Sequence, residues 1–294
     1  MRKRPFPTFW IALRQPPTRR LLCQLRRIEV LPENRRSPLL LLHGFPDSEH
    51  IFDAYVTPRE REQAWLRGRN IYAIALPNRR TNPNWPSLSD LRRRRLAREV
   101  AALIDIVIAA SPTGKVVIIA HNWGATLTWD LVRQRPDLPI ERMVALSVGS
   151  SFRYDWGEHG LRALAWLYSV VFGLPYYLPL ARYVTAASLV LGGYRAPDVI
   201  DAAFDSFHYW DWPLTLAQFP LRLAGYGQQP PFTDIRFPVL FIRCPLDRIA
   251  STAGFEQMLQ QRPDCQIYLT DNPHWFPEQR PEEILAVIRP FLAG

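Results

Sequence analysis

Short, continuous apolar runs recur along the chain and predict strands that are buried on both faces. They cover residues 38–42, 71–76, 115–120, 143–148, 239–243 and 266–269. Runs of this length suit a parallel sheet, whose two faces are both covered by helices. Apolar residues at helical spacing predict helices between them, over residues 50–67, 87–110, 123–134 and 282–292. The alternation predicts an α/β fold, with a mostly parallel sheet and helices on both faces.

One long segment interrupts this alternation. Residues 151–228 are apolar, rich in aromatic residues and punctuated by proline. Ligands of α/β sheets bind outside the carboxyl ends of the strands, so we expect the segment to be a helical cap, or lid, over that edge. The predicted organisation is a core made of residues 1–150 and 229–294, with the cap inserted between them.

Composition and charge narrow the classes of protein. The 294 residues are 48% hydrophobic and 12% aromatic, which excludes disorder as the main state. The net charge is +9, and all but two of the 36 basic residues are arginine, which suits a GC-rich bacterial genome. The arginines are dispersed and no nucleic-acid-binding motif accompanies them, so we expect no nucleic-acid partner. The three cysteines are far apart and form no CxxC pair; we expect neither a metal nor another cofactor.

Two apolar segments bear on location. The first, residues 9–13, is too short for a secretory signal, and we expect a cytoplasmic protein. The second, residues 163–181, carries no charge and approaches the length of a membrane span, but Pro175 and Pro179 interrupt it. We expect a hydrophobic lid over a lipophilic small-molecule substrate. Peripheral membrane contact through the basic residues 2–4 is an open alternative.

The most informative stretch reads VIIAHNWGA over residues 117–125. A predicted strand passes directly into a predicted helix through a turn flanked by small residues. This is the pattern of a nucleophile elbow, which holds residue 122 in a tight turn pointing out of the sheet. The backbone N–H of Trp123 stands at a helix N-terminus and can donate to an oxyanion.

Two further side chains follow later strands and complete a chemical set. Asp247 comes after the 239–243 strand, and His274 after the 266–269 strand. Nucleophile, acid and histidine in this order are typical of α/β-hydrolases, with the acid orienting the histidine as a base. Asp247 as a helix cap and Asp271 as the acid are the alternatives.

The strand over residues 38–42 ends in the sequence HGFP. This places the backbone N–H of Phe45 where a second oxyanion donor is needed. We expect His43 to stabilise this loop and His121 to pack at the elbow.

Four motifs carry a family resemblance. They are HGFPDS (43–48), AHNWGA (120–125), CPLDR (244–248) and NPHWFPE (272–278). With these motifs in this order and at this spacing, the chain resembles the epoxide hydrolases of the α/β-hydrolase superfamily. Haloalkane and fluoroacetate dehalogenases are related families. The resemblance implies a carboxylate at the elbow that attacks an epoxide carbon, an ester intermediate, and a histidine that activates water to cleave it.

The resemblance also implies cap tyrosines that protonate the epoxide oxygen. The candidates are Tyr209, Tyr154 and Tyr177, with Tyr176, Tyr183 and Tyr194 as others in the same segment. A phenol in an apolar pocket can donate this proton, although tyrosines also pack as amphipathic side chains.

The elbow residue departs from the family pattern, because Asn122 stands where the resemblance implies aspartate. An amide has no anionic oxygen with which to open an epoxide. Four interpretations stay open: an introduced change that traps substrate, a pocket kept only for ligand binding, a different reaction using the His274–Asp247 pair, and conversion of Asn122 to aspartate after synthesis. The leading hypothesis is an epoxide-hydrolase-like enzyme; a cofactor-free isomerase or cyclase and a ligand-binding pseudoenzyme are the alternatives.

Overall fold

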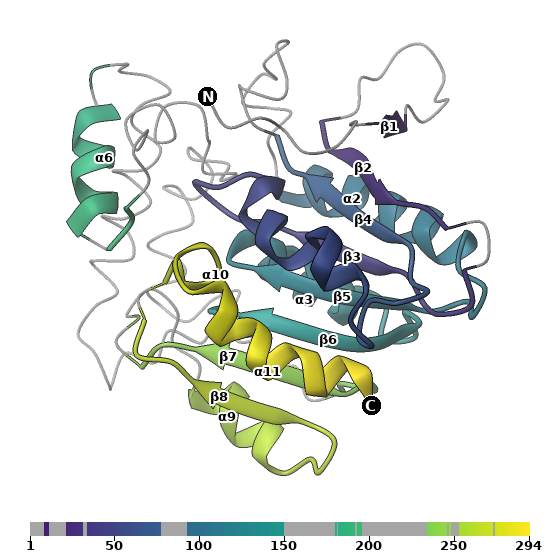
Figure 1. The fold of residues 1–294 in the computed structure, drawn as a ribbon. Helices are drawn as coiled ribbons and strands as arrows, with labels where there is room; N and C mark the ends of the chain where they lie inside the picture. The colour runs from purple at the N-terminus through teal and green to yellow at the C-terminus, as the bar shows by residue number, and fades with distance from the viewer. Residues whose placement is uncertain are drawn as a thin grey trace.

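The protein is built on one twisted sheet with helices on both faces (Figure 1). The structure is a computed structural model that describes residues 9–11, 22–31, 34–77, 93–149, 180, 182–191, 193–195, 234–245, 247, 253–272 and 274–294. The strands run in the order β1-β2-β4-β3-β5-β6-β7-β8. Their bounds are β1 Phe9–Ile11, β2 Gln24–Glu29, β3 Leu39–Leu42, β4 Ile71–Ala75, β5 Val116–His121, β6 Ile140–Leu146, β7 Val239–Arg243 and β8 Gln266–Leu269.

Strand direction determines which ends of the strands lie together. β2 pairs antiparallel with both β1 and β4, and all other neighbouring strands run parallel. The carboxyl ends of β3 to β8 therefore meet at one edge of the sheet. This confirms the predicted α/β fold with a mostly parallel sheet.

Helices cover both faces of this sheet. Their bounds are η1 Glu49–Val56 (a 3₁₀ helix), α1 Pro58–Arg61, α2 Arg93–Ala109, α3 Trp123–Gln134, α6 Arg182–Leu191, α9 Ala253–Gln260, α10 Phe276–Gln279 and α11 Pro281–Ala293. In Figure 1, η1 and α11 lie in front of the sheet and α2 lies behind it.

Strand β3 shows why its residues are all apolar. Leu39 and Leu41 pack with η1 and α11, whereas Leu40 and Leu42 pack with α2 and α3. All four side chains are completely buried. Each burial contributes about 1.5–3 kcal/mol, so packing on both faces stabilises the strand that leads to the carboxyl edge of the sheet.

Most predicted elements match the structure, and two differ. The helix predicted over 87–110 is α2, which is described from Arg93, and residues 87–92 lie outside the described residues. The helix predicted over 50–67 is wrong: a 3₁₀ helix ends at Val56, and Thr57 then caps the short helix α1, which begins at Pro58. Proline has no N–H to continue a helix, but it fits the first position of a new one. The strand predicted over 143–148 is β6, which begins earlier, at Ile140.

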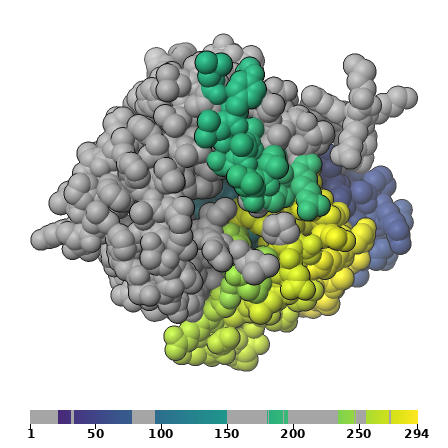
Figure 2. Space-filling view, turned by 90° about the vertical axis from the view of Figure 1, so that its left-hand side faces the viewer, coloured from purple at the N-terminus to yellow at the C-terminus, as the bar shows by residue number. Residues whose placement is uncertain are grey.

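The predicted cap lies mostly outside the described residues. Within 151–228 the structure describes residue 180, helix α6 and residues 193–195, so the domain boundaries stay a prediction. In Figure 2, α6 lies at the surface beside the C-terminal segment. None of the helices in the described part of the chain is long and apolar enough to cross a membrane.

Candidate active site

Strand β5 passes into helix α3 through a single residue, Asn122. Its φ of 51° and ψ of −115° lie outside the common backbone regions. Non-glycine residues adopt positive φ rarely and at an energetic cost, which the surrounding packing must offset. Added side-chain carbon at Gly44 would collide with the Asn122 side chain, and at Gly124 with the carbonyl oxygen of Leu42. These two glycines therefore allow the close approach that holds Asn122 at the carboxyl edge of the sheet.

An acid–histidine pair faces this turn from two neighbouring strands. Asp247 follows β7 and His274 follows β8. Nδ1 of His274 lies 2.5 Å from Oδ2 of Asp247, and both side chains are about 97% buried. Because a carboxylate only accepts hydrogen bonds, Nδ1 carries the proton and Nε2 presents its lone pair.

That lone pair is directed at the elbow. Nε2 of His274 lies 2.5 Å from Nδ2 of Asn122, which donates to it. Nδ2 also donates to the carbonyl oxygen of Phe45 over 3.3 Å. Since Phe45 O can only accept, the amide must turn its nitrogen and not its oxygen toward this corner. Asn122 thus uses both of its N–H groups, one on His274 and one on the Phe45 carbonyl.

The two proposed oxyanion donors lie on either side of Asn122. Trp123 is the first residue of α3, and an added Cβ on Gly44 would lie 2.8 Å from its backbone nitrogen. Phe45 follows Gly44 directly, and its carbonyl contacts Asn122. The structure brings Phe45 and Trp123 together around residue 122, and their role as an oxyanion hole stays a prediction.

The main chain of His274 is held by two hydrogen bonds that sequence reasoning missed. Nε2 of His121 and Oγ of Ser147 each donate to the His274 carbonyl oxygen over 3.1 Å. Ser147 directly follows β6 and has a φ of 69°. Its place after a strand beside the elbow is the only signal in the sequence. These two residues form what we call the carbonyl clamp.

Two other histidines, His43 and His121, lie near the elbow. Each is neutral and has defined hydrogen-bond partners. Nε2 of His43 accepts from the backbone N–H of Leu76, and Nδ1 donates to the Gly44 carbonyl, each over 2.9 Å. Burial lowers the pKa of His43. Burial, aided by the neighbouring His274, lowers the pKa of His121 well below its ordinary value. Neither is placed to act as a base on a substrate.

The model of the alpha/beta hydrolase family matches residues 39–287, which contain every part of this site. The chain belongs to the alpha/beta hydrolase family. The hydrolase candidate LipZ of Mycobacterium tuberculosis is 35% identical over 115 residues, which span 38% of this chain and only 36% of LipZ.

Solved α/β-hydrolase structures share the fold over nearly the whole chain. An epoxide hydrolase from Bacillus megaterium has a TM-score of 0.62 at 17% identity, covering 92% of this chain and 98% of that one. The carboxylesterase CesB from Bacillus subtilis has a TM-score of 0.60 at 15% identity, covering 97% and 91%. A haloalkane dehalogenase variant, DbeA, from Bradyrhizobium elkanii reaches 0.56 at 15% identity, covering 92% and 93%. At these identities the likeness is one of fold.

The tyrosines expected to serve this α/β-hydrolase site are mostly outside the described residues. This applies to Tyr209, Tyr154 and Tyr177, whose roles stay predictions. Of the others, Tyr183 is 49% exposed on α6. Tyr194 is buried, with its ring 5.1 Å from that of Trp275, which in turn lies 5.2 Å from the His274 imidazole.

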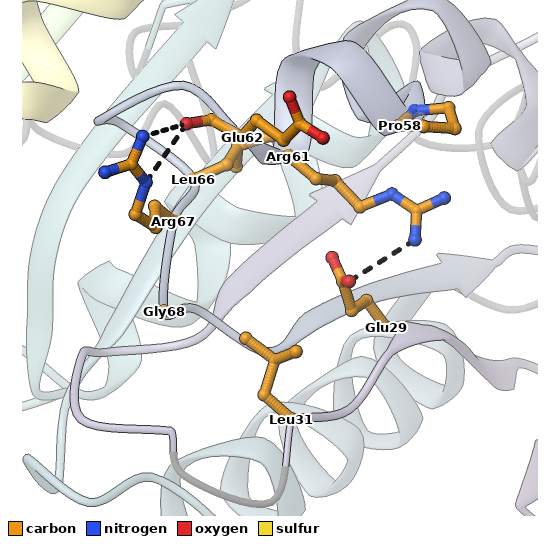
Figure 3. Close-up of a pocket in the computed structure, with 8 residues that line it drawn as sticks. All are labelled: Glu29, Leu31, Pro58, Arg61, Glu62, Leu66, Arg67 and Gly68. Atoms are coloured by element: carbon orange, nitrogen blue, oxygen red, sulfur yellow. Dashed lines mark hydrogen bonds and ion pairs between the residues drawn. The ribbon is translucent and has the colours of Figure 1, made fainter.

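A hollow of about 520 Å³ lies away from this site (Figure 3). Glu29, on its wall, pairs with the first residue of β4, which places the hollow at the amino edge of the parallel strands. Arg61 on its wall pairs with Glu29 over 3.4 Å, and Arg67 donates to the backbone carbonyl of Glu62.

Proposed function

We propose that this chain is an epoxide-hydrolase-like enzyme that acts on a lipophilic small molecule, with the His274–Asp247 pair as its base. One observation carries the proposal: the imidazole is oriented by a buried carboxylate at 2.5 Å and faces the elbow residue at 2.5 Å. A histidine with its proton fixed on Nδ1 and its Nε2 lone pair aimed at the reacting position is arranged as a general base.

The amide at position 122 changes the first chemical step. The nitrogen lone pair of an amide is delocalised and its oxygen is uncharged, so Asn122 does not form the ester that an aspartate would. Water takes the place of that nucleophile. Its oxygen bonds to an epoxide carbon as its proton passes to Nε2 of His274, the ring C–O bond breaks, and the imidazolium returns a proton to the ring oxygen.

Asn122 also sets a condition on this step. Its N–H occupies the Nε2 lone pair of His274, so the base acts only after water or substrate displaces that hydrogen bond. The backbone N–H groups of Phe45 and Trp123 are the proposed donors to charge on the substrate oxygen. Tyr209, Tyr154 and Tyr177 remain candidates for a direct proton donor.

The apolar surroundings support a lipophilic substrate. Phe45, Trp123 and Trp275 are each at least 95% buried beside the polar centre. Substrate sites are commonly lined by such side chains, with few polar groups that orient the ligand. Asn122 and His274 are polar groups at this centre that can orient a ligand.

The test is diol formation from a panel of lipophilic epoxides, followed in a single turnover in heavy-oxygen water. We expect the native chain to place solvent oxygen in the diol, and His274→Gln to lower the rate by about 10²–10⁴-fold. In Asn122→Asp, the first turnover should carry oxygen from the enzyme carboxylate. His50→Gln, at a half-exposed residue outside the site, should leave the rate unchanged.

Other outcomes would redirect the proposal. A product that is an isomer of the epoxide would indicate that the chain is an isomerase or cyclase. Ligand binding without turnover, unaltered in His274→Gln, would indicate a binding protein. One observation favours the binding-protein hypothesis: both N–H groups of Asn122 already donate hydrogen bonds within the protein.

A further inference from the structure

Helix α6 has an apolar stripe on its solvent side. Among the described residues, five of the seven large hydrophobic side chains that are exposed lie between residues 180 and 191, and Ala187 is exposed among them. Those on the helix follow the helical repeat and share one face. We call this face, together with Leu180 just before the helix, the α6 stripe: Leu180, Tyr183, Val184, Ala187, Val190 and Leu191.

Packing among the described residues does not explain this stripe. The opposite side of α6 already packs into the protein, with Thr185, Ala186 and Leu189 buried. A surface helix needs one apolar face for its core and normally presents polar residues on the other. Leu191 is 89% exposed and Leu180 is 78% exposed, so water covers most of each side chain. A cluster of this kind indicates a contact surface.

Charge identifies the kind of partner. No acidic residue occurs from 180 to 197, whereas Arg182 and Arg195 flank the stripe at its two ends. The guanidinium of Arg182 lies over the Tyr183 ring at 5.1 Å, and Arg195 is exposed. An apolar helix face with arginine at its borders is the composition of a helix that lies in a lipid interface. A second copy of this chain would bring another net charge of +9, which opposes self-association.

The end of α6 is joined to the catalytic segment. Nε2 of Gln279 donates to the Gly193 carbonyl over 2.9 Å. Tyr194 packs on Trp275, the residue after His274. Figure 2 shows α6 at the surface beside the segment that holds these residues. A surface in contact with α6 therefore lies close to the candidate active site.

We propose that the α6 stripe docks this protein on the surface of an anionic lipid bilayer. Docking places the catalytic edge where lipophilic molecules concentrate. Only this last consequence rests on the proposed function, because lipid binding is measured without any substrate.

The test is flotation of the full chain with vesicles of phosphatidylglycerol and phosphatidylcholine, and with phosphatidylcholine alone. We expect the native chain to float with the anionic vesicles and the double variant Val184→Glu/Leu191→Glu to partition at least about tenfold less. The matched control is Val30→Glu/Leu269→Glu, at side chains 49% and 54% exposed elsewhere on the surface. It should bind as the native chain does.

Several results would overturn the proposal. They are failure of the native chain to float, equal binding by the stripe variant, equal binding to neutral vesicles, and a native dimer that the stripe variant converts to a monomer. Leu191→Ser is a milder variant that should weaken flotation in the same direction, and the melting temperature of each variant reports on its folding. Diol formation is a separate readout, so failure of lipid binding leaves the hydrolase proposal standing.

Discussion

Mild acid should destabilise this protein through His121. The imidazole is completely buried, its Nε2 proton is used on the His274 carbonyl, and burial holds its pKa well below the ordinary value of 6.5. The side chain of Asp47 lies 3.9 Å from Nδ1. As the pH falls below about 6.5, the unfolded chain binds a proton on this residue and the folded chain does not, so the free energy of unfolding decreases.

The size of the effect follows from proton linkage. Each such group changes the free energy of unfolding by about 1.4 kcal/mol per pH unit, which amounts to about 2 kcal/mol between about pH 7 and about pH 5. His43 acts in the same direction, because burial lowers its pKa too. His50 acts in the opposite direction: a hydrogen bond to Asp53 raises its pKa, so its contribution is present at low pH and is lost as the pH rises.

Urea unfolding at a series of pH values measures this slope. We expect His121→Gln, which keeps an N–H donor for the carbonyl clamp, to remove about 2 kcal/mol of the acid-dependent loss. The matched variant His50→Gln should make the loss steeper. If His121→Gln and the native chain show the same pH dependence, His121 is not the group that resists protonation and the reasoning is refuted.

Two further substitutions test the packing behind the site and on the sheet. Gly124→Ala should lower the free energy of unfolding by about 1–3 kcal/mol, because the new methyl group collides with two backbone carbonyls at the end of β3; Gly294→Ala, at an open position, should be neutral in the same urea experiment. Glu60→Gln should cost about 1–3 kcal/mol, because the buried carboxylate accepts from Arg289 over 2.7 and 3.1 Å. Glu282→Gln removes an 80% exposed contact with the same arginine and should change little, so equal losses would contradict the importance of burial.

The central strands were predictable because their physical requirement is simple. A strand covered on both faces needs an apolar run, and residues 239–243 carry one with the observed bounds, buried up to Ile242. The bounds of β8, residues 266–269, were also predicted, although this strand lies at the edge of the sheet and its first and last residues are exposed. β2 was harder to recognise, because it is antiparallel near the sheet edge and includes Arg26 and Arg27. The helix break at Pro58 shows that a proline can end a helix even where the apolar spacing predicts that it continues.

The candidate site was predictable only in part. The order of Asn122, Asp247 and His274 along the chain reflects the order of the strands, so their meeting at one edge could be inferred. The role of Ser147 could not, because its hydroxyl contacts a backbone atom 127 positions away. A contact with a main-chain carbonyl leaves no trace in the identity of the accepting residue.

The carbonyl clamp has a consequence for how this fold changes its chemistry. His121 and Ser147 bind the backbone at position 274 and not its side chain, so the location of the proposed base and its reactivity are set by different residues. A substituted side chain at 274 or at 122 would be attached to a backbone that is already held in place. We therefore expect single substitutions at 122 or 274 to change the chemistry of the candidate site while its architecture is left intact.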